Sequence, residues 1–402
     1  MQRLVAVIAV LGLAVGALVA SSPSRSASFD LELQLSRALA APGIGPEQTG
    51  ALAVDLRTGS TVFDVNASAA LRPASVEKLA VAFVALRALG PRYRFRTELL
   101  GTGSLEQGTW NGNLVLVGGG DPSLALSDLE RLARKVAAMG IRHVTGRILG
   151  DESRFDARRG SPGWKPSFVG IESPPLSALS VEGVPLGSPN ASARAAARAL
   201  KLAFGRRGIV VDGLPGRGKA RDGALPLATD VSQPLALLVR RMNRESDNFY
   251  AELLLKELGV SIAGRGTTRA GARAVRRALA EAQVPLEGVR LADGSGLSLD
   301  DRLTTRALVS ILVAGASDPT IGSAFVSSLA VAGLSGTMER RLERPPTRGR
   351  VLAKTGTTNA ACALAGFVGE QYVFAILQNG SPVPYWTARA AQDRFVTVLA
   401  RS

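Results

Sequence analysis

The sequence of 402 residues is poor in several residue types that carry chemistry, and each shortage excludes a class of site. Its one cysteine, Cys362, can form neither a disulfide within the chain nor a cysteine-based metal centre. The setting Ala361-Cys362-Ala363 favours a small buried side chain. Its one histidine, His143, excludes a histidine-rich metal site. A Ser-His-Asp hydrolase would depend on this single residue, which has no serine or aspartate motif around it.

Lysine is scarce as well. The 48 basic residues include seven lysines, which leaves 48 − 7 = 41 arginines. Arginine keeps its proton in proteins, whereas a desolvated lysine can lose it, so a position that needs a neutral amine must be lysine. Of the seven, only Lys78 follows a serine, Ser75, by three residues.

The stretch around Ser75 predicts a loop that enters a buried helix. Pro73-Ala74-Ser75 precedes an apolar run from Leu79 to Leu86. Three residues along a helix rise about 4.5 Å and nearly complete a turn, so Ser75 and Lys78 share a face. The hydroxyl can then be a nucleophile and the amine its base. The plainer alternative is that Ser75 only caps the helix.

The net charge of +15 and the pI of about 10.9 raise the possibility of a nucleic-acid partner. The arginines are scattered, however, in short clusters such as Arg348-Gly349-Arg350, and no recognition-helix or aromatic-platform motif accompanies them. Weak attraction to an anionic membrane or wall polymer fits this charge better. We therefore expect no nucleic-acid partner.

Residues 1–27 have the pattern of a secretory signal. Arg3 precedes the uncharged run Leu4–Ala20, and small residues follow it. The run is also barely long enough to span a bilayer, so a retained membrane anchor is the alternative. Either way we expect the body of the protein to be exported.

Two further short motifs can join Ser75 and Lys78. Ser246-Asp247-Asn248 lies between two predicted helices, and Lys354-Thr355-Gly356-Thr357 follows an apolar strand. Alone, the first reads as a helix cap and the second as a glycine turn.

Together the motifs supply a complete set of roles. Ser246 can relay a proton to a leaving amine and Asn248 can hold a substrate amide. Lys354 can keep the local field positive, and the hydroxyls of Thr355 and Thr357 can bind a carboxylate. Backbone N–H groups of Ser75 and Thr357 can form an oxyanion hole, while Gly356 lets substrate lie along the strand.

With these motifs the chain resembles the serine penicillin-recognising enzymes, with their Ser-x-x-Lys, Ser-Asp-Asn and Lys-Thr-Gly set. More narrowly it resembles the D-alanyl-D-alanine carboxypeptidase/endopeptidase family, the class C low-molecular-mass penicillin-binding proteins. Accessory stretches carry the likeness, including Asn113–Leu124, Ser177-Ala178-Leu179-Ser180 and Asp293-Gly294-Ser295-Gly296-Leu297-Ser298. The resemblance implies cleavage of D-Ala-D-Ala in peptidoglycan stem peptides and covalent inhibition by β-lactams, with no cofactor and no metal.

The spacing of the motifs predicts the domain organisation. Ser75 and Ser246 are 246 − 75 = 171 residues apart, more than the 354 − 246 = 108 residues from Ser246 to Lys354. The resemblance implies an α/β (α+β) fold: a transpeptidase-like domain, an antiparallel sheet flanked by helices, over 28–91 and 226–402, with a smaller α/β domain inserted at 92–225. We expect the family's nested insertion to be reduced or missing here, because the stretch Val181–Ala191, where the family carries more chain, is short.

Two rival functions share the fold. A serine β-lactamase would need a carboxylate that activates the deacylating water, and Glu281, on what reads as an ordinary helix face, is a conceivable one. An inactive wall-binding protein would keep the fold without the chemistry, although intact motifs argue against it.

Overall fold

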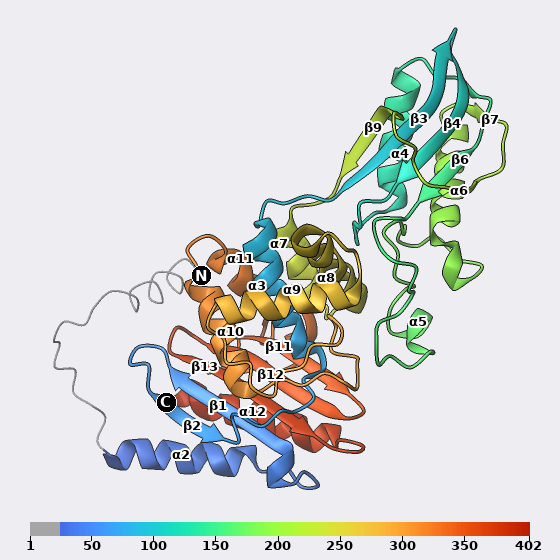
Figure 1. Cartoon of the computed structure of the whole chain (residues 1–402). Helices are drawn as coiled ribbons and strands as arrows, with labels where there is room; N and C mark the ends of the chain where they lie inside the picture. Colours follow the sequence, from blue (N-terminus) through green and yellow to red (C-terminus); the bar gives the residue numbers. More distant parts are fainter. Residues whose placement is uncertain (1–24) are drawn as a thin grey trace. The chain divides into compact units, whose positions relative to one another are not determined.

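The computed structural model describes residues 25–402, which form two compact units (Figure 1). Unit 1 contains the described residues up to Pro91, Val239–Ala251 and Ala272–Ser402, and unit 2 contains Arg92–Leu238 and Glu252–Gly271. Unit 2 begins at Arg92, and β9 (Leu225–Val231) pairs with β3 (Arg96–Glu106) inside its sheet.

The predicted signal or anchor, residues 1–27, lies outside the described residues except for its last three, which begin helix α2 (Arg25–Leu39). Within residues 25–402, none of the helices combines the length and the apolar character that crossing a bilayer requires.

The sheet of unit 1 is antiparallel throughout. Its strand order is β10 (Ala330–Val331), β11 (Val351–Thr358), β12 (Ala361–Val368), β13 (Tyr372–Asn379), β1 (Thr49–Asp55) and β2 (Thr61–Val65). Every residue of β12 and β13 is buried, because helices cover both faces of the sheet. β1 and β2 form a hairpin, whereas β12, with its small side chains, was not expected as a strand.

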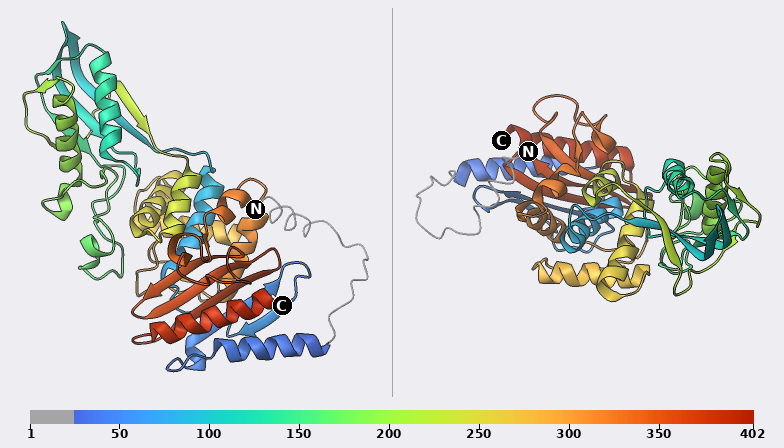
Figure 2. Two further views of the ribbon diagram at one scale, coloured as in Figure 1. Left: turned by 180° about the vertical axis from the view of Figure 1, so that it is seen from behind. Right: turned by 90° about the horizontal axis from the view of Figure 1, so that it is seen from above.

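A different set of helices covers each face of this sheet, as the views from behind and from above show (Figure 2). On one face α2 and α12 (Tyr385–Arg401) pack together, and Phe395 of α12 meets the Phe63 ring of β2 at 5.2 Å. On the other face lie the short 3₁₀ turn η3 (Ala74–Glu77), α3 (Lys78–Leu89) and α10 (Thr305–Ser317). The remaining helices are α7 (Leu235–Arg244), α8 (Asn248–Ala263), α9 (Thr268–Glu281) and α11 (Gly322–Ser327).

Unit 2 is built on a second, mixed sheet. Its main path is β7 (Val210–Val211), β5 (His143–Val144), β4 (Thr109–Val117), β3 and β9, while β6 (Ile148–Asp151) pairs with β4 and with β8 (Gly216–Arg217). Helices α4 (Leu126–Ala138) and α6 (Ser192–Gly205) bury an apolar stripe with the sheet, and the short α5 (Phe168–Ile171) lies in the long loop. Between α4 and α6 the chain forms the short strands β5 and β6.

The one cysteine and the one histidine both lie in structural settings. Cys362 is buried in β12, and burial raises the pKa of its thiol. His143 of β5 lies near the surface of unit 2 with Nε2 2.9 Å from Asp212. Both observations agree with the structural roles expected for them.

Candidate active site

Ser75 and Lys78 are in direct contact at the start of α3. Ser75 lies in η3, and Lys78 Nζ lies 2.8 Å from its Oγ. In a 3₁₀ turn residues three apart eclipse each other, so this turn brings the two side chains together more directly than an α-helix would. Ala74 has φ of 48°, a region that few residues other than glycine enter, and so begins the turn in a strained conformation.

The other neighbours of Lys78 decide what its amine can do. Nζ also lies 2.8 Å from Asn248 Oδ1 and 2.7 Å from the carbonyl oxygen of Ser295, and the lysine side chain is fully buried. These two oxygens can only accept hydrogen bonds. A neutral amine that donates its two hydrogens to them has its lone pair left for the Ser75 hydroxyl. The geometry therefore suits proton transfer from Ser75 to Lys78.

Ser246 and Lys354 form a second hydroxyl–amine contact. Lys354 Nζ donates to Ser246 Oγ at 2.8 Å and to its neighbouring carbonyl, that of Thr355, at 2.7 Å. Ser246 has φ of 60°, a left-handed conformation that costs roughly 1–2 kcal/mol in a residue other than glycine. The short loop between α7 and α8 thus carries backbone strain at the residue whose hydroxyl meets Lys354.

The two amines influence each other. Burial, and then the positive charge of Lys78, lower the pKa of Lys354 well below its usual 10.5. Both causes favour the neutral form of the Lys354 amine. A substrate carboxylate beside Lys354 would act in the opposite direction and favour its charged form.

Strand β11 offers a free edge beside Ser75. Within residues 25–402, β10 pairs only with Leu352 and Ala353, so the edge beyond them is not covered by a strand. Gly356 faces η3, and a Cβ there would come within 3.0 Å of the Ser75 backbone nitrogen. The absence of a side chain at 356 keeps open the space in front of the N–H of Ser75.

Three buried carboxyl groups lie next to the catalytic turn. Oxygens of Glu77, Asp293 and Asp301 lie within 4.8 Å of one another. Burial, and then the charge of Asp293, raise the pKa of Asp301 well above its usual 3.8. A carboxyl of this group therefore keeps a proton at pH values where an exposed aspartate has lost it.

Asp293 organises the loop that carries Ser295. Its carboxylate accepts N–H bonds from Ser295 at 3.0 Å, Gly296 at 2.7 Å and Ser298 at 2.9 Å. These bonds orient the Ser295 carbonyl that lies against Lys78. The loop contributes to the site through its backbone.

Thr355 and Thr357 project from β11 into a separate cavity of about 270 Å³. They alternate with Lys354 and Gly356, which face η3, because successive residues of a strand point to opposite faces. The Thr355 hydroxyl donates to Thr337 Oγ1 at 2.8 Å. Hydroxyl groups of the Lys-Thr-Gly-Thr segment thus line the far side of the same strand edge.

Comparison with known proteins identifies the family of the chain. The sequence profile of the D-Ala-D-Ala carboxypeptidase 3 (S13) family matches residues 31–185 and 185–402. The chain belongs to this family. It is accordingly a hydrolase of a peptidase family, and the family resemblance of its motifs is confirmed.

Individual members of the family resemble the chain over most of its length. The carboxypeptidase DacB of Mycolicibacterium smegmatis is 30% identical, covering 95% of this chain and 85% of the relative. A D-alanyl-D-alanine carboxypeptidase of Actinomadura sp. is 29% identical over 92% of this chain and 84% of the relative. The crystal structure of penicillin-binding protein 4 from Haemophilus influenzae superposes with a TM-score of 0.79 at 24% identity, covering 93% and 98% of the two chains. This likeness confirms the expected penicillin-binding-protein fold.

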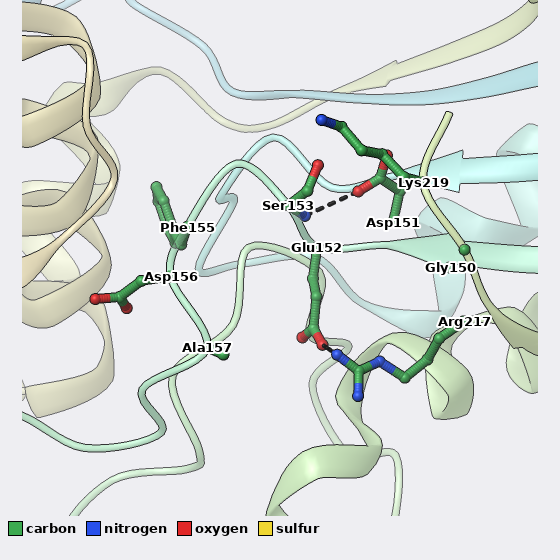
Figure 3. A pocket seen from close by; sticks show the side chains of 10 residues that line it. Gly150, Asp151, Glu152, Ser153, Phe155, Asp156, Ala157, Arg217 and Lys219 are labelled. Atoms are coloured by element: carbon green, nitrogen blue, oxygen red, sulfur yellow. Dashed lines mark hydrogen bonds and ion pairs between the residues drawn. The ribbon is translucent and has the colours of Figure 1, made fainter. Parts of the chain in front are cut away.

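Unit 2 has a cavity of its own, which differs chemically from the catalytic cluster (Figure 3). Its volume is about 360 Å³, and Glu152 on its wall pairs with Arg217 at 2.8 Å and with Arg159 at 2.6 Å. Asp151 accepts the Ser153 N–H at 2.8 Å. Among the described residues, no hydrogen bond joins the Ser153 hydroxyl to an amine, so this cavity lacks a hydroxyl–amine contact like that of Ser75 and Lys78.

The structure thus gathers all the motif residues predicted from sequence in unit 1. Ser75, Lys78 and Asn248 form one contact group, and Ser246 and Lys354 form the next. The carbonyl of Ser295 and the carboxyl cluster were missed as parts of the site. The Asp293–Ser298 stretch had been noted as a family signature, but nothing in its sequence shows that a backbone oxygen would reach Lys78.

Proposed function

We propose that the protein is a serine D-alanyl-D-alanine carboxypeptidase/endopeptidase that acts on peptidoglycan stem peptides through an acyl-enzyme on Ser75. The observation that carries the proposal is the 2.8 Å contact between Ser75 Oγ and a buried lysine amine that also meets two acceptors, Asn248 Oδ1 and the Ser295 carbonyl. The relatives named as D-alanyl-D-alanine carboxypeptidases support the substrate class.

Acylation begins when Lys78 takes the Ser75 proton as Oγ attacks the carbonyl carbon of the penultimate D-alanine. The oxyanion that forms accepts hydrogen bonds from the backbone N–H groups of Ser75 and Thr357. The proton passes through the Ser246 hydroxyl to the leaving amine, and the terminal residue departs. Water then hydrolyses the ester by the reverse proton route, which restores both the hydroxyl and the neutral amine.

Substrate is held along the free edge of β11. The peptide adds as a strand beyond Leu352 and Ala353, which Gly356 permits by having no side chain. Asn248 holds the substrate amide, and Lys354, Thr355 and Thr357 attract the carboxylate. β-Lactams carry an equivalent carboxylate and amide, so they acylate Ser75 as covalent inhibitors. A β-lactam complex is known for the H. influenzae protein, which supports this inference.

Unit 1 is the catalytic domain and unit 2 the accessory domain in this proposal. The two matched segments of the family profile meet at residue 185, and the alignment with the Actinomadura enzyme, 458 positions, is longer than this chain. Both facts support a missing nested segment near Val181–Ala191. The protein is exported, and its charge of +15 favours weak association with an anionic membrane or wall polymer.

Labelling with a fluorescent penicillin tests the proposal. Wild-type protein is expected to label covalently, and Ser75→Ala is expected not to. A matched control, Ser317→Ala at the end of α10, should label as the wild type does. Mass spectrometry of peptidoglycan incubated with each protein should show loss of terminal D-alanine with the wild type and the control alone. Labelling of Ser75→Ala equal to wild type would refute the acyl-enzyme.

The β-lactamase alternative has no observation in its favour. Glu281 lies at the end of α9 with 59% of its side chain exposed and pairs with Arg277 at 2.9 Å. A carboxylate held in solvent by an arginine is poorly placed to activate a water inside a buried site. An inactive wall-binding protein is equally unsupported, because the hydroxyl–amine contacts are formed.

A further inference from the structure

The cavity behind β11 contains an arginine that the motifs did not indicate. Besides the hydroxyls of Thr337, Thr355 and Thr357, it is lined by Arg341, Cys362, Tyr385 and Arg389. Its hydroxyls come from the strand edge beside Ser75, and its two arginines come from other elements. The two guanidinium groups differ in what they bind.

Arg341 already has an acidic partner. Its Nε donates to Asp393 at 2.5 Å, its Nη2 donates to Gln392 Oε1 at 2.9 Å, and the residue is only 5% exposed. This charge is neutralised by a structural ion pair. It holds the loop after η5 (Gly336–Met338) against α12.

Arg389 differs because its hydrogen-bond partners are neutral. Nη1 donates to Tyr385 Oη at 2.9 Å, and Nη2 donates to the backbone carbonyl of Arg340 at 3.3 Å. Within residues 25–402, no carboxylate lies in ion-pair distance of it. These bonds use two of the five N–H donors of a guanidinium, so the side chain is held in place with donors to spare.

The surrounding field is positive as well. Arg389 lies one turn into α12, whose first turn contains no acidic residue. A cation near a helix N-terminus is electrostatically unfavourable, because the helix dipole is positive there. Since Asp393 neutralises Arg341, the positive end of the helix acts on Arg389 without a compensating carboxylate and favours an anion beside it.

We propose that Arg389 recognises the substrate carboxylate next to the scissile D,D-peptide bond, together with the hydroxyls of Thr337 and Thr357. This inference rests on the proposed function and deepens it, because it adds a second charged group, besides Lys354, to the carboxylate site. Neutral hydroxyls bind a carboxylate weakly, whereas a guanidinium adds a charge-assisted bond of about twice the strength. Arg389 is thus a determinant of specificity for peptides whose carboxylate is free.

The test compares a stem pentapeptide that ends in D-Ala-D-Ala with the same peptide amidated at its C-terminus. For wild-type protein, kcat/KM should favour the acid over the amide. Arg389→Gln should lower kcat/KM for the acid by roughly 10–100-fold, as expected for loss of a charged hydrogen bond, and change the amide by less than threefold. Arg389→Lys, which keeps the charge, should recover part of the loss. Arg340→Gln, a matched control with an exposed side chain outside the cavity, should behave as wild type does.

A binding measurement covers the case in which the amide is not cleaved at all. In a Ser75→Ala background, Arg389→Gln should weaken binding of the acid by a similar factor and leave binding of the amide unchanged. Equal effects on acid and amide, or no effect on the acid, would overturn the carboxylate assignment. Either result leaves the acyl-enzyme intact, provided that the Arg389→Gln protein still labels with penicillin at Ser75.

Discussion

The neighbouring residues Glu77 and Lys78 belong to two different buried clusters, one of carboxyl groups and one of amines. The amines of Lys78 and Lys354 contact the hydroxyls of Ser75 and Ser246. The carboxyl of Glu77 instead joins Asp293 and Asp301. Burial acts in opposite directions on the two sets, because it lowers the pKa of Lys354 and raises that of Asp301. In both cases it favours the neutral form.

The difference lies in what each cluster touches. The amines meet hydroxyls that can react, whereas Asp293 accepts bonds from backbone N–H groups of its own loop. We infer that Lys78 accepts the Ser75 proton, that Lys354 supplies positive charge, and that the carboxyls hold the loop that presents the Ser295 carbonyl to Lys78.

The largest effect is expected from Lys78→Arg. Arginine stays protonated, so it cannot accept the Ser75 proton, and loss of a general base typically costs roughly 10²–10⁴-fold in rate. The second-order rate constant for acylation by penicillin should fall by that amount. Stopped-flow measurement with a chromogenic β-lactam would determine it.

Lys354→Arg is the matched control, because it makes the same substitution at an equally buried amine. Its proposed role needs a positive charge, which arginine keeps, so the acylation rate should fall less than in Lys78→Arg by at least roughly tenfold. Equal losses in the two variants would mean that steric disruption, and not proton transfer, explains both.

Asp293→Asn should have a smaller effect, on stability and rate together. The variant loses the charge that strengthens its bonds to Ser295, Gly296 and Ser298. We expect a loss of about 2 kcal/mol in the free energy of unfolding in urea, the value of one or two weakened charged hydrogen bonds. Acylation should slow because the Ser295 carbonyl is less firmly placed. Asp300→Asn, an exposed neighbour, should change neither quantity.

These cluster roles show where sequence reasoning succeeds and where it stops. The Ser75–Lys78 pair was predictable because helical spacing alone brings residues three apart together. Ser246 and Lys354 were recognisable as motifs, but their contact joins residues 108 positions apart and depends on tertiary packing. The Ser295 carbonyl carries no side-chain signal, and Arg389 is one of 41 arginines. Strand β12 was missed because Ala361–Val368 is rich in small residues that have weak strand propensity.

Asp301→Asn should change the pH dependence of stability rather than its overall level. A carboxyl whose pKa is raised on folding contributes most favourably at acidic pH, and this contribution declines as pH rises from the ordinary value to the raised one. Asparagine cannot ionise, and its Oδ1 can still accept the Ala292 N–H. Relative to the wild type, the variant should therefore gain stability from about pH 4 upward.

Thermal unfolding of both proteins between pH 4 and pH 8 would measure this gain. The difference in Tm should level off once the wild-type carboxyl has ionised. A variant that loses stability relative to the wild type as pH rises would show that Asp301 is ionised and favourably paired in the folded protein. The carboxyl cluster would then be a charged network, unlike the amines.

The smallest effect is expected from Glu281→Gln, an exposed carboxylate that contrasts with the buried three. Its pairing with Arg277 is a surface i,i+4 contact, worth roughly 0.3–0.5 kcal/mol. Release of penicilloate from the acyl-enzyme should stay within about twofold of the wild-type rate, because a general base must lie within hydrogen-bond reach of the water it activates. A fall of tenfold or more would give Glu281 a catalytic role and revive the β-lactamase alternative. Deacylation would then depend on a carboxylate in solvent, and the division between reactive amines and structural carboxyls would not hold.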